Sequence, residues 1–333
     1  MGVIMVPAGN NTSKTTNVYS PGNVTIVQIT AMTQTAGSSV TGSSQAGHTD
    51  YLIDFAPCRD VVMAFGHVET LSSAIRDALS STKPQCSNGS IVDNCMYNNL
   101  KITLTSGELI GTAGGPTFAG NGFDFGAVDD RTKTLGFINT SGSAAQTGFI
   151  NINGIGSYTH AACPLDYFSP NLKQVLYSRI TMKNQGANGI PACGTTMQDK
   201  AGTAQGDWYD QNSKNSNQGL DIAGALAFAH SNLDASMAEV SVGTDLAQSQ
   251  YGGTQLIYTP THRGYINREP SEIKPDGHVY CFEGHEGAIL NNTQGDYIHF
   301  DAQLTNSTTL KIDYGTGSCS TNPSLSSSIT YTR

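Results

Sequence analysis

The fold of the first half of this chain is decided by four segments: GHTDYLIDF (residues 47–55), VVMAFGHVETLS (61–72), SGELIGTAGG (106–115) and GFDFGAVDD (122–130). The first two are rich in β-branched and aromatic residues, and Pro57-Cys58-Arg59-Asp60 stands between them. That pattern predicts a β-hairpin, because proline and aspartate favour turns. The third segment has the glycine content of tight turns, and the fourth continues the β pattern. We therefore predict an antiparallel β domain.

In order and spacing these segments resemble the core of the lysostaphin-like zinc endopeptidases, which cut peptidoglycan cross-bridges. In that family an aromatic-x-His-Leu element supplies a catalytic His, and a glycine-rich turn precedes a His-x-His strand. Phe65-Gly66-His67-Val68 matches the first element, and Glu108–Gly114 matches the turn. The resemblance covers roughly residues 45–130. It implies an antiparallel β domain in which His67 lies over the cleft.

The metal ligands of that family are missing from the chain. The place of His-x-His is taken by Phe123-Asp124-Phe125-Gly126, which contains no His. The family's His and Asp separated by three residues are also absent, because His48 and Asp54 are separated by five. We expect a protein that does not hydrolyse peptide bonds and keeps His67 as a relic. If a metal site survives, His48 and Asp124 are its expected ligands.

A second hypothesis places an oxygen-rich metal site among His48, Asp50, Asp54, Asp124 and Asp129. Zinc catalysis needs three protein ligands and an open position, whereas carboxylate-rich sites suit calcium better. The alternative is that Asp50 and Asp54 lie on solvent faces, that Asp124 caps a turn, and that no cofactor is bound. We favour that alternative, and also favour His67 as a polar residue satisfied by hydrogen bonds.

The fold class we predict is mainly β: a lysostaphin-like antiparallel β domain with one packed helix, then a second β-rich domain with a few short helices. Residues 1–23 are expected to form an extended arm, 24–160 the first domain and 161–333 the second. Helical spacing of apolar residues predicts helices at 70–81 and 171–180. An alanine-rich stretch predicts another at 220–230, and residues 148–155 have a β pattern.

Composition narrows the range of partners. Only 13% of the residues are charged and the formal net charge is −9, with no cluster of Lys or Arg. These features argue against nucleic-acid binding. No apolar run approaches the ~20 residues that a membrane-spanning helix needs.

Cysteines and glycosylation motifs favour an exported protein, extracellular or at the cell surface. Cys86 and Cys95 enclose a polar loop that a disulfide would close, and Cys281 and Cys319 can form a second bridge. Three cysteines remain, so at least one thiol is unpaired: Cys58, Cys163 and Cys193. Asn-x-Ser/Thr motifs, each weak alone, stand at Asn10, Asn11, Asn23, Asn88, Asn139, Asn291 and Asn306.

Two features suggest partners. The N-terminal arm carries Val3, Ile4 and Val6, and it could add as a strand to a sheet edge of a second copy, giving a homo-oligomer or a filament. The alternative is that the arm folds back on its own domain. The single tryptophan, Trp208, could stack on a sugar ring of a cell-wall glycan or peptidoglycan, although a lone Trp in a β domain is more often part of the core.

Overall fold

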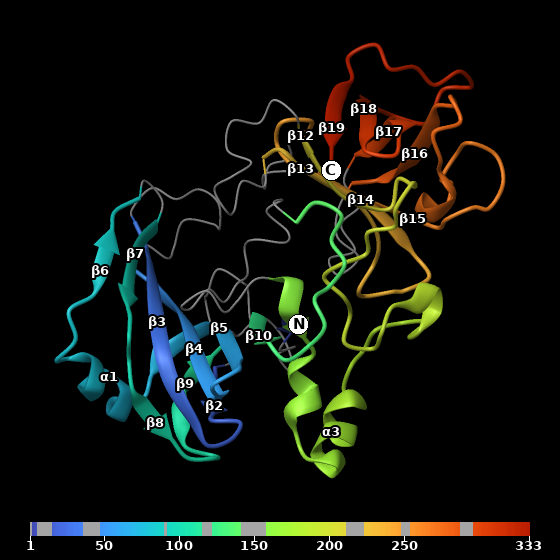
Figure 1. Cartoon of the computed structure of the whole chain (residues 1–333). Coiled ribbons are helices and arrows are strands. Elements are labelled where there is room, and N and C mark those ends of the chain that lie inside the picture. Colours follow the sequence, from blue (N-terminus) through green and yellow to red (C-terminus); the bar gives the residue numbers. More distant parts are fainter. Residues whose placement is uncertain are drawn as a thin grey trace. The chain divides into compact units, whose positions relative to one another are not determined.

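The computed structural model describes residues 2–4, 15–35, 47–89, 92–114, 122–140, 158–210, 223–247, 254–286 and 296–333. The chain is mainly β with two sheets, as predicted (Figure 1). It forms two compact units: Met1–Thr134 together with Gly148–Phe168, and Leu135–Thr147 together with Ser169–Arg333. The main boundary between the units therefore follows Phe168, some residues after the expected position at 160.

The first unit is built on one sheet whose main strand order is β1-β10-β5-β4-β3-β7-β6. All its pairings are antiparallel, and β5 lies between β10 and β4. The predicted hairpin of β4 and β5 is present. The strands are β1 (Gly2–Ile4), β2 (Thr16–Tyr19), β3 (Val24–Gln34), β4 (Thr49–Cys58), β5 (Val61–Leu71), β6 (Gln85–Ser87), β7 (Val92–Tyr97), β8 (Ile102–Leu104), β9 (Leu109–Ala113), β10 (Gly122–Asp129) and β11 (Ala161–Ala162).

The helix predicted at 70–81 is present as α1 (Ser73–Leu79). It begins later than predicted because β5 continues to Leu71. The hydroxyl of Ser72 then caps the helix by accepting a hydrogen bond from the backbone N–H of Ile75 at 3.4 Å. Ile75 and Leu79 are buried, so the apolar stripe seen in the sequence packs inward.

The N-terminal segment contributes two strands to this same unit. β1 pairs with β10, with Val3 opposite Phe123, and β2 pairs with β9. This arrangement corresponds to the fold-back alternative for the arm. Pairing of the arm with a second copy stays a prediction.

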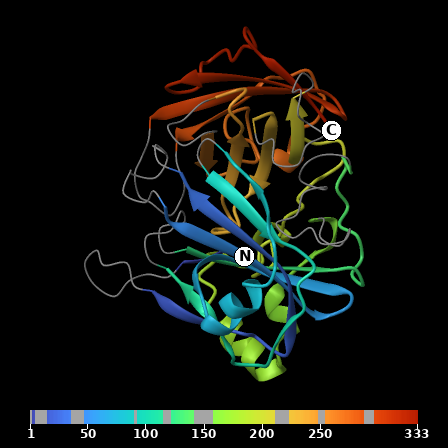
Figure 2. The ribbon, with the colours of Figure 1, turned by 90° about the vertical axis from the view of Figure 1, so that its left-hand side faces the viewer.

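The second unit is built on one antiparallel sheet in the order β15-β14-β13-β12-β19-β18-β17-β16. An isolated bridge between Leu256 and Glu286 joins the two ends, so the sheet curves back on itself, from the yellow strands to the red ones in Figure 2. The strands are β12 (Gly206–Asp210), β13 (Ala225–His230), β14 (Ala238–Val242), β15 (Thr254–Tyr258), β16 (Tyr280–His285), β17 (Tyr297–Asn306), β18 (Thr309–Thr316) and β19 (Ile329–Thr332).

One core fills this closed sheet. Alternate residues of its strands point inward, among them the fully buried Trp208, Phe228, Phe282 and Phe300.

The other helical elements in the described part of the chain are short: η1 (Tyr158–His160), η2 (Pro164–Tyr167), α3 (Pro170–Tyr177), η3 (Ala187–Gly189) and η4 (Pro270–Glu272). Among the described residues, no helix is long and apolar enough to cross a membrane.

The helix predicted at 220–230 is wrong, because Ala225–His230 is strand β13. Burial alternates along it, and it pairs with both β12 and β14. Its alanines favour a helix locally, but pairing on both edges and burial of Leu226 and Phe228 decide for the strand. The helix predicted at 171–180 is present as α3. Residues 148–155 lie outside the described part of the chain.

Candidate functional site

A β-bulge in the middle of the first sheet positions His67. One residue of β4, Leu52, stands opposite two residues of β5, Gly66 and His67. The backbone of His67 takes a φ of 61°, in the left-handed region that non-glycine residues rarely adopt. A bulge with such a residue re-aims a side chain, and strained backbone of this kind gathers at functional sites.

The imidazole of His67 lies between carboxylates from the two flanking strands. Its Nδ1 is 2.7 Å from Oδ2 of Asp50 on β4, and its Nε2 is 3.4 Å from Oδ2 of Asp124 on β10. Asp50 is buried, with 1% of its side chain exposed. The hydrogen bonds to Asp124 and Asp50 raise the pKa of His67 to about 9, against the opposing effect of burial. The ring is therefore a cation at neutral pH.

A second ionisable pair extends this group. Nε2 of His48 lies 3.6 Å from Oε1 of Glu69. Burial raises the pKa of Glu69 and the charge of Asp50 adds to that rise, while His48 opposes it. Buried side-chain atoms without a hydrogen-bond partner in the described part of the chain include His48 Nε2, Asp50 Oδ1 and Glu69 Oε2. We call His48, Asp50, His67, Glu69 and Asp124 the His67 cluster.

The His67 cluster does not supply the donor set of a zinc peptidase. His67 Nε2 and Asp124 face each other, but Asp50 lies on the other ring nitrogen and His48 faces Glu69. Zinc needs three protein ligands that converge on one point. Among the described residues, no group of three or more His, Cys, Asp or Glu is arranged to hold a metal ion.

The other two aspartates of the proposed metal site lie apart from this cluster. Asp54 is 1% exposed and bonds to the amide of Gln28 at 3.2 Å. Burial raises the pKa of Asp54 to about 8. Asp129 accepts hydrogen bonds from Arg131 and from the hydroxyl of Tyr167. These hydrogen bonds hold the pKa of Asp129 well below its usual range, and the bond from Arg131 has the largest effect.

Three sequence expectations about aspartates therefore need correction. Asp50 and Asp54 do not lie on solvent faces, because the side chains of both are buried within β4. Asp124 does not cap a turn, since it lies within β10 opposite Gly66. Local sequence shows the alternation of a strand, but it does not show whether both faces of the sheet are covered.

Trp208 cannot act as a sugar platform from the surface. Its side chain is fully buried, and its indole N–H donates to the carbonyl of Ala204 at 2.8 Å. The guanidinium of Arg333 lies over the ring, 4.1 Å from its centroid. The prediction that Trp208 binds a glycan is wrong, and the core alternative is correct.

The structure contains the two predicted disulfides, Cys86–Cys95 and Cys281–Cys319. Cys163 and Cys193 are also disulfide-bonded, which makes three disulfides, and Cys58 is a free, exposed thiol. Of the glycosylation motifs, Asn23, Asn88 and Asn306 are exposed and Asn139 is half-buried. Asn10, Asn11 and Asn291 lie outside the described residues.

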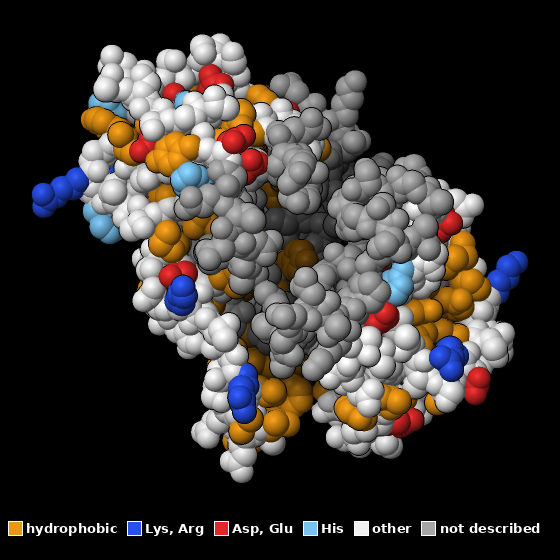
Figure 3. Space-filling model, turned by 180° about the vertical axis from the view of Figure 1, so that it is seen from behind, with side chains coloured by type: hydrophobic (Ala, Val, Ile, Leu, Met, Phe, Trp, Pro, Cys, Tyr) orange, Lys and Arg blue, Asp and Glu red, His pale blue; other side chains and the backbone are white. Residues whose placement is uncertain are grey.

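Sequence reasoning missed Glu69 and did not foresee that His67 would bond to Asp50. The alternation of β4 and β5 could have placed Asp50 and His67 on neighbouring strands, but the bulge that brings their side chains together has no clear sequence signal. Lys and Arg side chains stand scattered on the face shown in Figure 3, in keeping with the low charge. Comparison with family models, curated proteins and solved structures finds no match to this chain.

Proposed function

We propose that this chain is an exported, non-catalytic structural protein built on a peptidase-like β domain. The observation that carries the proposal is the position of His67 between two carboxylates. With a pKa near 9, the ring holds a proton on each nitrogen at neutral pH. An imidazolium has no lone pair, so it neither accepts a proton from water nor ligates a metal.

Export is supported by the three disulfides, because such bonds persist in oxidising compartments. The surface contains few charges and is solvated largely by hydroxyl and amide groups. We propose the exposed Asn23, Asn88 and Asn306 as glycan acceptors. A cell-wall glycan or peptidoglycan is the partner that the resemblance suggests.

Self-association is proposed to use the first strand. β1 is only three residues long and pairs along β10. The same backbone hydrogen bonds can form between two copies if β1 is exchanged, and repeated exchange in one direction builds a filament.

Metal analysis combined with a peptidoglycan digestion assay tests the non-catalytic proposal. We expect neither stoichiometric zinc nor turnover. Stoichiometric zinc that is lost in His67→Ala, Asp124→Ala and His48→Ala, together with turnover, would instead establish a divergent zinc endopeptidase. Asp130→Ala serves as the control, because Asp130 is exposed and outside the cluster.

Strand exchange is tested with a cysteine pair placed across the β1–β10 register. Val3 and Phe123 are partners in that register, so Val3→Cys with Phe123→Cys, in a Cys58→Ser background, reports where β1 sits. Exchange predicts cross-linked dimers and larger species on a non-reducing gel. Deletion of residues 1–14, which spares β2, should then abolish association. Purely intramolecular cross-links, or unchanged association after deletion, would refute exchange.

A further inference from the structure

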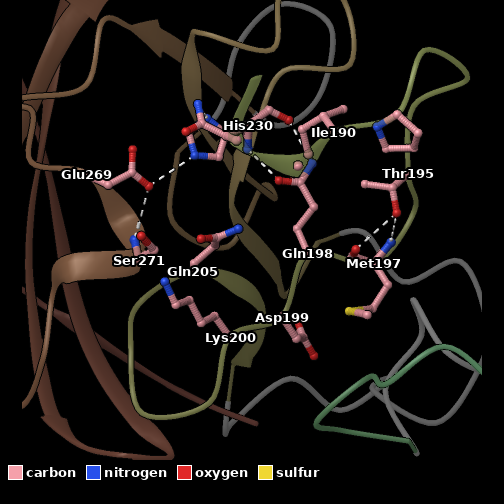
Figure 4. Close-up of a pocket in the computed structure, with 13 residues that line it drawn as sticks. Ile190, Thr195, Met197, Gln198, Asp199, Lys200, Gln205, His230, Glu269 and Ser271 are labelled. Atoms are coloured by element: carbon pink, nitrogen blue, oxygen red, sulfur yellow. Dashed lines mark hydrogen bonds and ion pairs between the residues drawn. The ribbon is translucent and has the colours of Figure 1, made fainter. Parts of the chain in front are cut away.

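The second unit contains a cavity of about 480 Å³ that no motif in the sequence marks. It is lined by η3, by the loop that connects η3 to β12, by the end of β13 and by the start of η4 (Figure 4). Its volume falls within the range of small-molecule sites, about 300–1,000 Å³.

Two side-chain amides fix the wall of this cavity. Gln198 pairs with the backbone of His230, donating to its carbonyl at 2.8 Å and accepting from its N–H at 2.7 Å. Asn232 pairs in the same way with the backbone of Thr195, both at 3.0 Å. The loop is thereby held to the end of β13 before any ligand arrives, which lowers the entropy cost of binding.

Gly194 shows how closely that loop is held. Its φ is 74°, and an added Cβ would come within 3.0 Å of the side chain of Asn232. A glycine is therefore required at this position.

A buried His–Glu pair forms one end of the cavity. Nε2 of His230 lies 3.0 Å from Oε1 of Glu269, and the two residues are 2% and 4% exposed. The amide of Asn188 lies 3.2 Å from Nδ1 of His230 and donates to the carbonyl of Ala235. Because an amide nitrogen is a donor, Nδ1 is the acceptor and Nε2–H donates to Glu269.

The carboxylate of Glu269 faces the cavity. The hydrogen bonds from His230 and from the N–H of Ser271 end on Oε1, and the hydroxyl of Ser271 is a further donor to the carboxylate. Burial alone would raise the pKa of Glu269, but the hydrogen bond from His230 and the bonds from Ser271 bring it below its usual value. The anion is therefore maintained at neutral pH, with Oε2 as an acceptor.

The remaining lining is polar on the side of Glu269 and mixed on the opposite side, where Thr195 lies beside Ile190 and Met197. Figure 4 shows Gln205, Lys200 and Ser271 on the side of Glu269, and Ile190 and Met197 across from them. Asp199 also lines the cavity, but its carboxylate already accepts the N–H groups of Ile138 and Asp207 at 2.7 and 2.8 Å. The lining thus carries the carboxylates of Glu269 and Asp199 and the ammonium of Lys200, and the charge of Asp199 also interacts with that of Arg333, which does not line the cavity.

We propose that this cavity binds a neutral, polyhydroxylated ligand of one or two sugar rings. Hydroxyl groups of the ligand donate to Glu269 and exchange hydrogen bonds with Gln205 and Ser271. The C–H face of the ring packs against Ile190 and Met197. The proposal is independent of whether the His67 cluster is catalytic, because all of these residues belong to the second unit.

The test is a titration of the full chain with glucose, galactose, mannose, N-acetylglucosamine, lactose and chitobiose. The methyl resonance of Met197, assigned with Met197→Leu, reports binding inside the cavity. We expect at least one sugar to shift it in a saturable way. Glu269→Gln should weaken that binding at least tenfold, because the amide retains the shape but replaces the acceptor charge.

Two further variants separate binding from folding. Gln205→Ala removes a lining amide without touching the His–Glu pair, and it should weaken binding several-fold. Glu272→Gln is the matched control, because Glu272 bonds to His262 and Arg268 and does not line the cavity. The proposal is overturned if no sugar shifts Met197, if both lining variants bind like the native chain, or if ethylammonium shifts Met197 and the sugars do not.

Discussion

Nδ1 of His67 lies 2.7 Å from Oδ2 of Asp50, a carboxylate that is 1% exposed. This contact ties the imidazole of His67, which lies at the bulge of β5, to the neighbouring strand β4. A His whose folded pKa is raised from 6.5 to about 9 contributes stability that is complete below pH 6.5 and is lost as the pH rises through 9.

NMR titration of the His67 ring should give an apparent pKa near 9. Asp124→Asn and Asp50→Asn should each lower it, because each removes one hydrogen-bonded carboxylate. Asp130→Asn should leave it unchanged. A pKa near 6.5 in the native chain would show that the ring is not held between two anions.

His67→Asn should destabilise the first unit by about 1–3 kcal/mol, because Asp50 is left buried without its charged partner. Asn tolerates a positive φ, so the backbone is not strained further. In a double-mutant cycle measured by urea unfolding, His67→Asn with Asp50→Asn should cost less than the sum of the two single changes. Strict additivity would mean that the two side chains do not interact.

Asp54→Asn should become more stabilising as the pH rises. The folded pKa of Asp54 is raised from 3.8 to about 8. The contribution of this carboxyl to the free energy of unfolding is therefore complete below pH 3.8 and is lost as the pH rises through 8. The free energy of unfolding of Asp54→Asn, relative to that of the native chain, should increase between pH 4 and pH 8 and then level off. The slope cannot exceed about 1.4 kcal/mol per pH unit. A difference independent of pH would contradict the burial of a neutral carboxyl.

Trp208→Phe should lower the stability of the second unit by about 1–3 kcal/mol, because the carbonyl of Ala204 loses its buried donor. Trp208 is the only tryptophan, so its fluorescence reports on this core alone. Its emission should be that of a buried indole and should resist quenching by iodide. Strong quenching in the folded chain would place the ring at the surface.

Thiol titration of the folded, unreduced chain should find one reactive group, and Cys58→Ser should remove it. The six other cysteines are disulfide-bonded. Non-reducing peptide mapping of protein from its native source should find Cys86 linked to Cys95. Free thiols at both positions there would count against export.

The sequence alone predicted much of this fold because the determining patterns are local. The hairpin of β4 and β5 follows from apolar alternation around a Pro-Cys-Arg-Asp turn, and α1 follows from the spacing of Ile75 and Leu79. The Cys86–Cys95 bridge follows from two cysteines that enclose a short polar loop. In each case the deciding residues belong to one continuous stretch of sequence.

Tertiary structure decided the rest, because the deciding contacts join distant segments. Ala225–His230 is a strand through pairing with β12 and β14, against the helical preference of its alanines. The charge of His67 depends on Asp124, on the neighbouring strand β10, and on Asp50, 17 positions away and buried by the sheet. Glu269 meets His230 across 39 positions. Burial and hydrogen bonding across strands set these side chains' chemistry, and neither is encoded in any single stretch of sequence.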